Sequence, residues 1–167
     1  MELHWRYMFR LLLTVMLLLL SDACLAYSCQ PHMTLDEQFN GSKRVFLVYV
    51  LETRLEEELQ RKMSERDGSA DSEAVKLVSA GYRIVEDYKG EKSYKPRLLD
   101  ILGIGTGYVG LTPGVYYLVF LGDVRDYETS DMRAVDMCTV PVAHHRLDVP
   151  QFQKSLDEVR ALVKGKS

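Results

Sequence analysis

Hydrophobic residues in the middle of the chain recur with the period of a β-strand. Residues 44–53 read RVFLVYVLET and place apolar side chains on both faces of the expected strand. The two faces carry Val45, Leu47, Tyr49 and Leu51, and Phe46, Val48 and Val50. A strand that is apolar on both faces is typically buried on both, so we expect a central strand or one in a closed barrel. Residues 115–121, VYYLVFL, give the strongest strand prediction in the chain.

Three weaker patterns predict further strands. Residues 74–88 alternate apolar and polar side chains on either side of Ala80-Gly81, which predicts a strand that is bent or bulged there. Residues 95–104 form another candidate, and residues 134–144 a short one. The turn at 89–92 and the glycine-rich stretch from Gly103 to Gly114 connect these elements.

The charged stretch 54–74 is ambiguous. Its first half can extend the preceding strand or form a turn or two of helix. Its second half, SERDGSADSE, contains no apolar residue beyond alanine, and we interpret it as a mobile loop.

The period changes to that of a helix at the C-terminus. Asp148 is a candidate cap and Pro150 suits the first turn. One helical face then carries Phe152, Leu156, Val159 and Val163. These features predict an amphipathic helix over 150–167 that ends near Lys164-Gly165 and packs on the β-domain of residues 27–149.

The order of these elements predicts a mainly β fold. About five strands follow one another without the crossover helices that a parallel sheet requires. We therefore expect a five-stranded Greek-key barrel with a C-terminal amphipathic helix.

Residues 1–26 have the pattern of a cleaved secretory signal. Arg6 and Arg10 precede an apolar run over 11–20, which is shorter than the roughly 20 residues of a membrane-spanning helix. Ala26 ends the preferred cleavage site, and cleavage after Ser28 is the alternative. An uncleaved anchor and a lipoprotein with a lipidated Cys24 are the other possibilities. The signal predicts a secreted or periplasmic protein that meets the membrane only during export.

Charge and cysteine content refine this picture. The chain carries a net charge of −3, and removal of residues 1–26 deletes two basic and two acidic residues and leaves that charge unchanged. Such a domain has no electrostatic preference for nucleic acid. Only Cys29 and Cys138 remain after cleavage, and two cysteines in an exported domain most simply form one disulfide, with two free thiols as the alternative.

No motif in the chain predicts catalysis or a cofactor. Residues 105–110 match GxGxxG, but a strand rather than a helix follows them, so a dinucleotide site is not expected. His144 and His145 are neighbours that a strand would point to opposite faces, so we expect no metal site there. The acidic side chains of residues 123–131 are interpreted as a solvated loop.

Several segments, taken in order, resemble the netrin-like or tissue-inhibitor-of-metalloproteinases-like (TIMP-like) family of OB folds. They are residues 28–31 (SCQP), 39–50 (FNGSKRVFLVYV), 82–90 (YRIVEDYKG), 111–121 (LTPGVYYLVFL) and Cys138. The resemblance covers residues 28–140, and its most distinctive parts are YKG and PGVYYLVFL. The chain departs from the animal inhibitors in having at most one disulfide in the mature domain, and Val48 stands where the family often has glycine. It implies a minimal, single-disulfide member with an OB barrel.

The sequence therefore predicts an exported, non-enzymatic binding module whose partner is another protein of the envelope or extracellular space. We place its binding surface at the tethered N-terminus and the loops 103–114 and 123–134, with Cys29, Gln30, His32 and Tyr108 as contact residues. One alternative is a metalloprotease inhibitor in which cleavage after Ser28 makes Cys29 an N-terminal zinc chelator, as the resemblance implies. Another is a small envelope hydrolase that uses His144 or His145 with a loop carboxylate.

Overall fold

The computed structural model describes residues 33–67, 76–90, 95–102, 107–122 and 132–165. These residues form one mixed β-sheet of six strands and three helices. The strands are β1 (Arg44–Leu55), β2 (Lys76–Lys89), β3 (Arg97–Leu102), β4 (Tyr116–Leu121), β5 (Met132–Val135) and β6 (Val142–His144). The helices are α2 (Leu35–Gly41), α3 (Glu57–Asp67) and α4 (Pro150–Lys164). The signal sequence predicted at 1–26 lies outside the described residues.

The sheet has the order β5-β3-β2-β1-β4-β6, and every pair is antiparallel except β3 with β5. The mainly β architecture and the terminal helix predicted from the sequence are confirmed. The closed barrel of five strands is not seen, because strand pairing leaves β5 and β6 as the two edges of an open sheet of six strands.

The extra strand arises from a turn inside the segment predicted as one strand. Asp136 directly follows β5, and its carboxylate Oδ1 accepts the backbone N–H groups of Cys138 at 2.9 Å and Thr139 at 2.8 Å. This short side-chain-to-backbone turn interrupts the strand. The chain then continues as β6, which pairs with β4 instead of β3.

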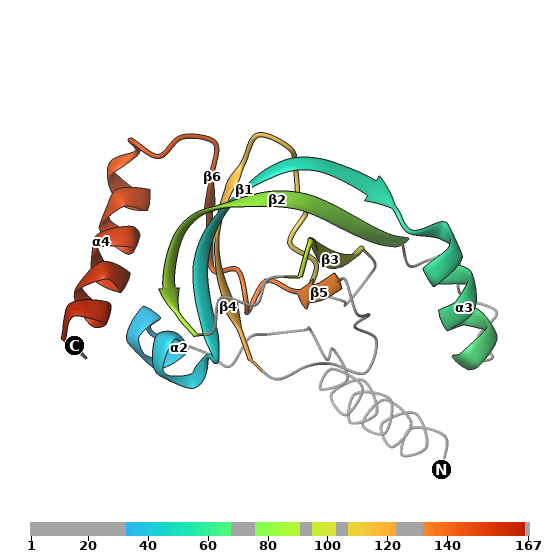
Figure 1. The fold of residues 1–167 in the computed structure, drawn as a ribbon, viewed down its shortest axis with the longest axis horizontal. Helices are drawn as coiled ribbons and strands as arrows, with labels where there is room; N and C mark the ends of the chain where they lie inside the picture. Colours follow the sequence, from blue (N-terminus) through green and yellow to red (C-terminus); the bar gives the residue numbers. More distant parts are fainter. Residues whose placement is uncertain (1–32, 68–75, 91–94, 103–106, 123–131, 166–167) are drawn as a thin grey trace, which may run out of the picture.

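β1 and β2 are long and arch together over the sheet (Figure 1). Their register shifts at three places, where one strand carries an additional residue. Such bulges bend and twist a strand pair, which explains the arch. The predicted bend at Gly81 lies beside one of these shifts, but the additional residue there is Leu51 of β1.

Two hydrophobic clusters use the two faces of β1, as its sequence predicts. Phe46, Val48 and Val50 pack in the inner cluster with Tyr117, Val119 and Leu121 of β4. Val45 and Leu47 pack on the other face, where α2 and α4 cover them with Phe39, Phe152, Leu156 and Val159. A third, small cluster joins Leu59 and Met63 of α3 to Leu77 of β2 and Leu99 of β3.

Three helix predictions need correction. The first half of the charged stretch 54–74 both extends the strand and forms a helix, because β1 runs to Leu55 and α3 follows it. The helix continues to Asp67, into the half of the stretch that was expected to be a loop. α4 begins as predicted at Pro150, but Asp148 does not cap it, because its carboxylate accepts a hydrogen bond from Arg146 at 2.8 Å. α2 was not predicted, although Thr34 and Glu37 form a capping box at its start.

Gly90 shows why the YKG segment ends in glycine. Its φ is +97°, and a Cβ there would lie 2.5 Å from the carbonyl oxygen of Lys43. Both the left-handed backbone and the close approach require a residue without a side chain.

Within the described ranges, no helix is long and apolar enough to cross a membrane.

Candidate binding surface

The structure places two of the predicted site residues. Tyr108 lies in the loop between β3 and β4, and Cys138 lies in the turn between β5 and β6. Cys29, Gln30 and His32 lie outside the described residues, as do parts of both predicted loops, 103–106 and 123–131. Residues 132–134, predicted as the end of the second loop, belong to β5 instead. The described geometry therefore comes from residues 107–114 and from the turn 136–140 that contains Cys138.

Cys138 takes part in a disulfide. Its partner is not among the described residues, so the pairing with Cys29 stays a prediction. The turn that presents Cys138 is well defined by Asp136, which is only 3% exposed. The carboxylate of Asp136 accepts the N–H groups of Cys138 and Thr139, and the backbone N–H of Asp136 donates to the hydroxyl of Thr139 at 2.8 Å.

A buried carboxylate fixes the backbone on both sides of Gly110. Asp100 of β3 is fully buried and accepts the N–H groups of Val109 at 3.0 Å, Gly110 at 2.7 Å and Leu111 at 3.2 Å. Bonds from backbone N–H groups to an ionised acceptor are stronger than neutral ones. Three consecutive backbone N–H groups of this glycine-rich connection are therefore held by a single side chain.

Tyr117 fixes the same segment from β4. Its hydroxyl accepts the N–H of Thr112 at 2.8 Å and donates to the carbonyl of Gly110 at 3.1 Å. Burial raises the pKa of this phenol above its ordinary value, so the hydroxyl keeps its proton and remains a donor. Asp100 and Tyr117 together fix residues 109–112 from two strands.

One hydrogen bond joins the Tyr108 loop to the Cys138 turn. The N–H of Met137 donates to the carbonyl of Gly107 at 2.7 Å. Each residue next to this bond exposes a large apolar side chain, Tyr108 at 56% and Met137 at 45%. We call Gly107, Tyr108, Met137 and Cys138 the disulfide-proximal surface. It is uncharged, it adjoins backbone that Asp100 and Asp136 hold, and its Tyr108 and Met137 side chains are exposed.

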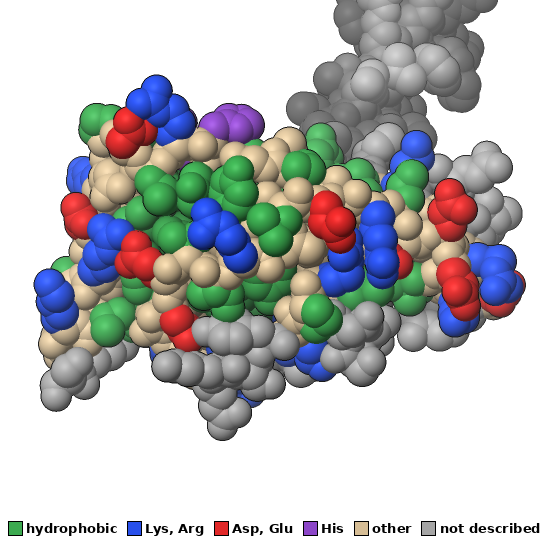
Figure 2. All heavy atoms as spheres, turned by 45° about the horizontal axis from the view of Figure 1, so that its top comes forward, with side chains coloured by type: hydrophobic (Ala, Val, Ile, Leu, Met, Phe, Trp, Pro, Cys, Tyr) green, Lys and Arg blue, Asp and Glu red, His purple; other side chains and the backbone are tan. Residues whose placement is uncertain are grey.

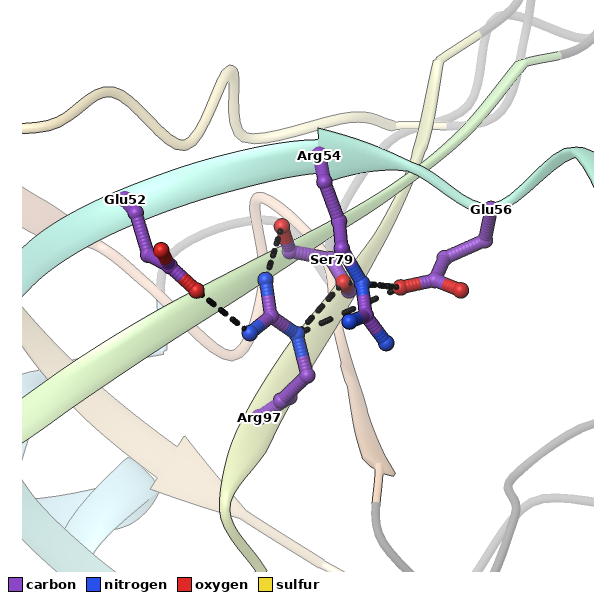
Figure 3. Close-up of polar contacts among 5 residues, drawn as sticks. All are labelled: Glu52, Arg54, Glu56, Ser79 and Arg97. Carbon is purple, nitrogen blue, oxygen red and sulfur yellow. Dashed lines mark hydrogen bonds and ion pairs between the residues drawn. The ribbon is translucent and has the colours of Figure 1, made fainter.

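A polar cluster that the sequence did not predict lies at the other end of the arch (Figure 3). Arg97 of β3 donates through Nε to the hydroxyl of Ser79 at 2.7 Å and pairs through Nη1 with Glu52 at 2.8 Å. Ser79 donates in turn to Glu56, which also pairs with Arg54 at 2.6 Å. The cluster therefore ties the ends of β1, β2 and β3 together.

The chemistry of this cluster favours a structural role. The hydrogen bond and charge of Arg97 lower the pKa of Glu52. Burial raises the pKa of Glu56, but the hydrogen bonds from Ser79 and Arg54 outweigh it and leave the pKa below its ordinary value. A carboxylate with a lowered pKa is a weak base, and Ser79 is fully buried. The hydroxyl is thus neither activated nor accessible to a substrate.

The two histidines do not form a shared site. The rings of His144, in β6, and His145 lie 6.5 Å apart in an edge-on arrangement. His144 contacts Phe152 of α4, and its Nδ1 accepts the backbone N–H of Arg146 at 3.1 Å. Among the described residues, no three histidine, cysteine or acidic side chains are grouped so that they could hold a metal ion.

Sequence reasoning missed Asp100 and Met137 as parts of the surface. The only sequence signal for Asp100 is an acidic residue inside the apolar run LLDIL, and such a residue, when buried, needs hydrogen-bond donors. Met137 has no such signal, because its position depends on the turn that Asp136 forms.

No family model matches the chain, and a search of curated proteins found no match.

Proposed function

We propose that this protein is an exported, non-enzymatic binding module that recognises another protein through the disulfide-proximal surface. The observation that carries the proposal is the exposure of Tyr108 and Met137 on two segments whose backbones are joined by a hydrogen bond. Tyrosine and methionine are enriched at protein interfaces. A surface that is ordered before binding loses little conformational entropy when a partner docks.

The location of Cys138 supports the same surface. Cys138 directly follows Met137 and is disulfide-bonded, so a second segment of the chain would be tethered at this surface. We propose that the partner cysteine is Cys29, which would tether the new N-terminus with Gln30 and His32 to this surface. The bond would close a loop of about 110 residues, and the loop-entropy model then gives it about 4–5 kcal/mol of stabilisation.

We further propose that the sheet is an OB-type barrel of the TIMP-like kind. Only residues 136–141 separate β5 from β6, the two edge strands, so a short connection links the edges. β5 pairs with β3, and the segment that follows it runs along β4, where the N–H of Phe120 donates to the carbonyl of Thr139 at 2.7 Å. Taken together, β5 and β6 act as one interrupted fifth strand that bridges β3 and β4, which favours an interrupted barrel over a flat sheet.

Site-specific crosslinking tests the proposed surface. A photoreactive p-benzoylphenylalanine replaces Tyr108 in one variant and Leu55 in the other. Leu55 is the matched control, because it is 52% exposed at the end of β1. We expect the exporting cell to yield a discrete protein adduct from position 108 and none from position 55.

A second substitution makes this test specific. Met137→Asp places a charge in the apolar surface and should abolish the adduct formed from position 108, whereas Leu55→Asp should leave it intact. Circular dichroism of each variant reports that the fold is retained. Equal adducts from positions 108 and 55, or an adduct that survives Met137→Asp, would show that the partner does not bind here.

A further inference from the structure

Four side chains line up across four strands on the outer face of the sheet. Tyr49 of β1 is directly opposite Arg83 of β2 on one side and Tyr116 of β4 on the other. Tyr116 is in turn opposite His144 of β6. Directly opposed residues share a face of the sheet, so these four residues form one transverse row. We call it the Arg-Tyr-Tyr-His row.

The members of the row contact one another. The rings of Tyr49 and Tyr116 lie 4.8 Å apart, and the guanidinium carbon of Arg83 lies 4.9 Å from the centre of the Tyr49 ring. A cation over an aromatic face is attracted by the ring's electrons, which orients it. At the other end, the ring of His144 lies 6.2 Å from that of Phe152 in α4.

The row lies where the helices stop covering the sheet. Val45 and Leu47 share its face and are buried under α2 and α4. Tyr49, Tyr116 and His144 are only half-buried, and Arg83 is exposed. Figure 2 shows hydrophobic side chains gathered over the strands beside α4, with a basic side chain among them. The apolar face therefore continues beyond its helical cover.

Arg83 is an available cation within this apolar surface. Elsewhere, exposed arginines have carboxylate partners, as in Arg61–Glu65 at 2.7 Å and in Arg146 with Asp148. Arg83 makes no ion pair with any residue in the described ranges. Its contact with Tyr49 positions the guanidinium and leaves its N–H groups able to bind a carboxylate.

The opposite end of the row offers a hydrogen-bond donor. The Nδ1 of His144 accepts the backbone N–H of Arg146 at 3.1 Å. In a neutral imidazole the proton then resides on Nε2, which is a donor. Three strand spacings of about 4.8 Å separate Arg83 from His144, or roughly 14 Å. An extended peptide of about four or five residues covers that distance.

We propose that the Arg-Tyr-Tyr-His row binds an extended acidic segment of a partner protein. A carboxylate of that segment pairs with Arg83, an apolar side chain packs on Tyr49 and Tyr116, and a backbone carbonyl accepts from His144. A nucleic acid or an anionic membrane fits less well, because such surfaces are bound by several cations together and the row holds only one. This site is separate from the disulfide-proximal surface.

Nuclear magnetic resonance titration of the exported, oxidised protein tests the proposal. The probe is the blocked peptide Ser-Leu-Glu-Leu-Ser, with Ser-Leu-Gln-Leu-Ser as its uncharged match. We expect saturable shifts at the amides of Tyr49, Arg83, Tyr116 and His144. The glutamine peptide should bind about two- to five-fold more weakly, which is the size of effect that an exposed charge pair provides.

Matched variants identify the group responsible. Arg83→Gln should bind both peptides equally, whereas Arg61→Gln, which removes an exposed arginine of α3, should retain the preference for glutamate. A Tyr108→Ala variant should bind the glutamate peptide normally, which separates this site from the one proposed above. Equal affinity of the wild type for both peptides, or a preference that survives Arg83→Gln, would overturn the proposal.

Two other occupants are distinguished by the same spectra. The proposal is wrong if protein concentration alone shifts the four amides, because the row is then a contact between copies. It is also wrong if phosphatidylglycerol vesicles shift them and the glutamate peptide does not.

Discussion

Asp100 shows how one residue determines the shape of a loop. A carboxylate without partners would be costly at a fully buried position, but three backbone N–H groups of the following loop surround this one. The same bonds satisfy donors that would otherwise be buried and unpaired. The loop that presents Tyr108 is therefore fixed from inside the sheet.

Asp100→Asn should loosen that loop. The amide has a single acceptor oxygen and places an NH2 group against the loop donors, so we expect a loss of about 2–3 kcal/mol in the free energy of unfolding. Hydrogen exchange at the amides of 109–111 should accelerate more than exchange in β1. Asp148→Asn, at an exposed carboxylate, is the control. Unchanged protection at 109–111 would mean that Asp100 does not hold the loop.

Glu86 and Arg160 form an ion pair between β2 and α4. Nε of Arg160 lies 3.0 Å from Oε2 of Glu86, and about a third of each side chain is exposed. The hydrogen bond from Arg160 lowers the pKa of Glu86. A lowered carboxylate pKa contributes stability above the unfolded pKa of about 4.3, and that contribution is lost as the pH falls through the folded pKa.

The Glu86 pair thus predicts a pH-dependent stability difference. At pH 7, Glu86→Gln should lower the free energy of unfolding by about 1 kcal/mol, since a partly exposed pair is screened by solvent. The difference should shrink as the pH falls below about 4. Urea unfolding of the wild type and of Glu86→Gln at pH 7 and below about pH 4 measures this difference in the free energy of unfolding. The exposed Glu65→Gln is the control. A constant difference would show that the pair does not act through ionisation of Glu86.

The elements that sequence patterns predicted best are those with clear periods. β1 and β4 are long apolar runs, and α4 has apolar residues at helical spacing, so these three were found near their observed bounds. α2 was missed because it has only seven residues and one buried side chain, Phe39. The capping box at Thr34 and Glu37 was the available signal.

Other elements depend on particular side-chain contacts, some local and some between distant residues, which periodicity does not report. The division between β5 and β6 follows from the turn at Asp136, and the missing cap at Asp148 follows from its pairing with Arg146. The Arg97 cluster brings together residues up to 45 positions apart. The row from Arg83 to His144 likewise depends on strand register.

Phe152 tests whether α4 is an integral part of the domain. Its ring is 1% exposed in the cluster between α4 and the sheet. Phe152→Ala should therefore cost about 3–5 kcal/mol of stability. The exposed Gln151→Ala, one position earlier, should change it by less than about 0.5 kcal/mol. Equal and small effects in urea unfolding would show that the helix is a loosely attached tail.

At the scale of the whole molecule, the fold joins an apolar core to two half-covered surfaces. The bulges arch β1 and β2, and residues 136–141 connect the two edge strands, β5 and β6. The disulfide-proximal surface lies at that connection, and the Arg-Tyr-Tyr-His row lies where the helical cover of the outer face ends. Sequence patterns predicted the Tyr108 loop of the first surface, placed Met137 and Cys138 in a strand, and did not predict the row.

Export and oxidation are prerequisites for the proposed surface, so the intact mass of the protein recovered outside the cytoplasm is its most direct test. We predict a chain that begins at Tyr27, is lighter by two hydrogen atoms than its reduced form, and resists thiol alkylation until it is reduced. A chain that begins at Cys29 would favour the metalloprotease-inhibitor alternative. A chain that retains Met1, or in which Cys29 and Cys138 are both alkylated without reduction, would contradict the account.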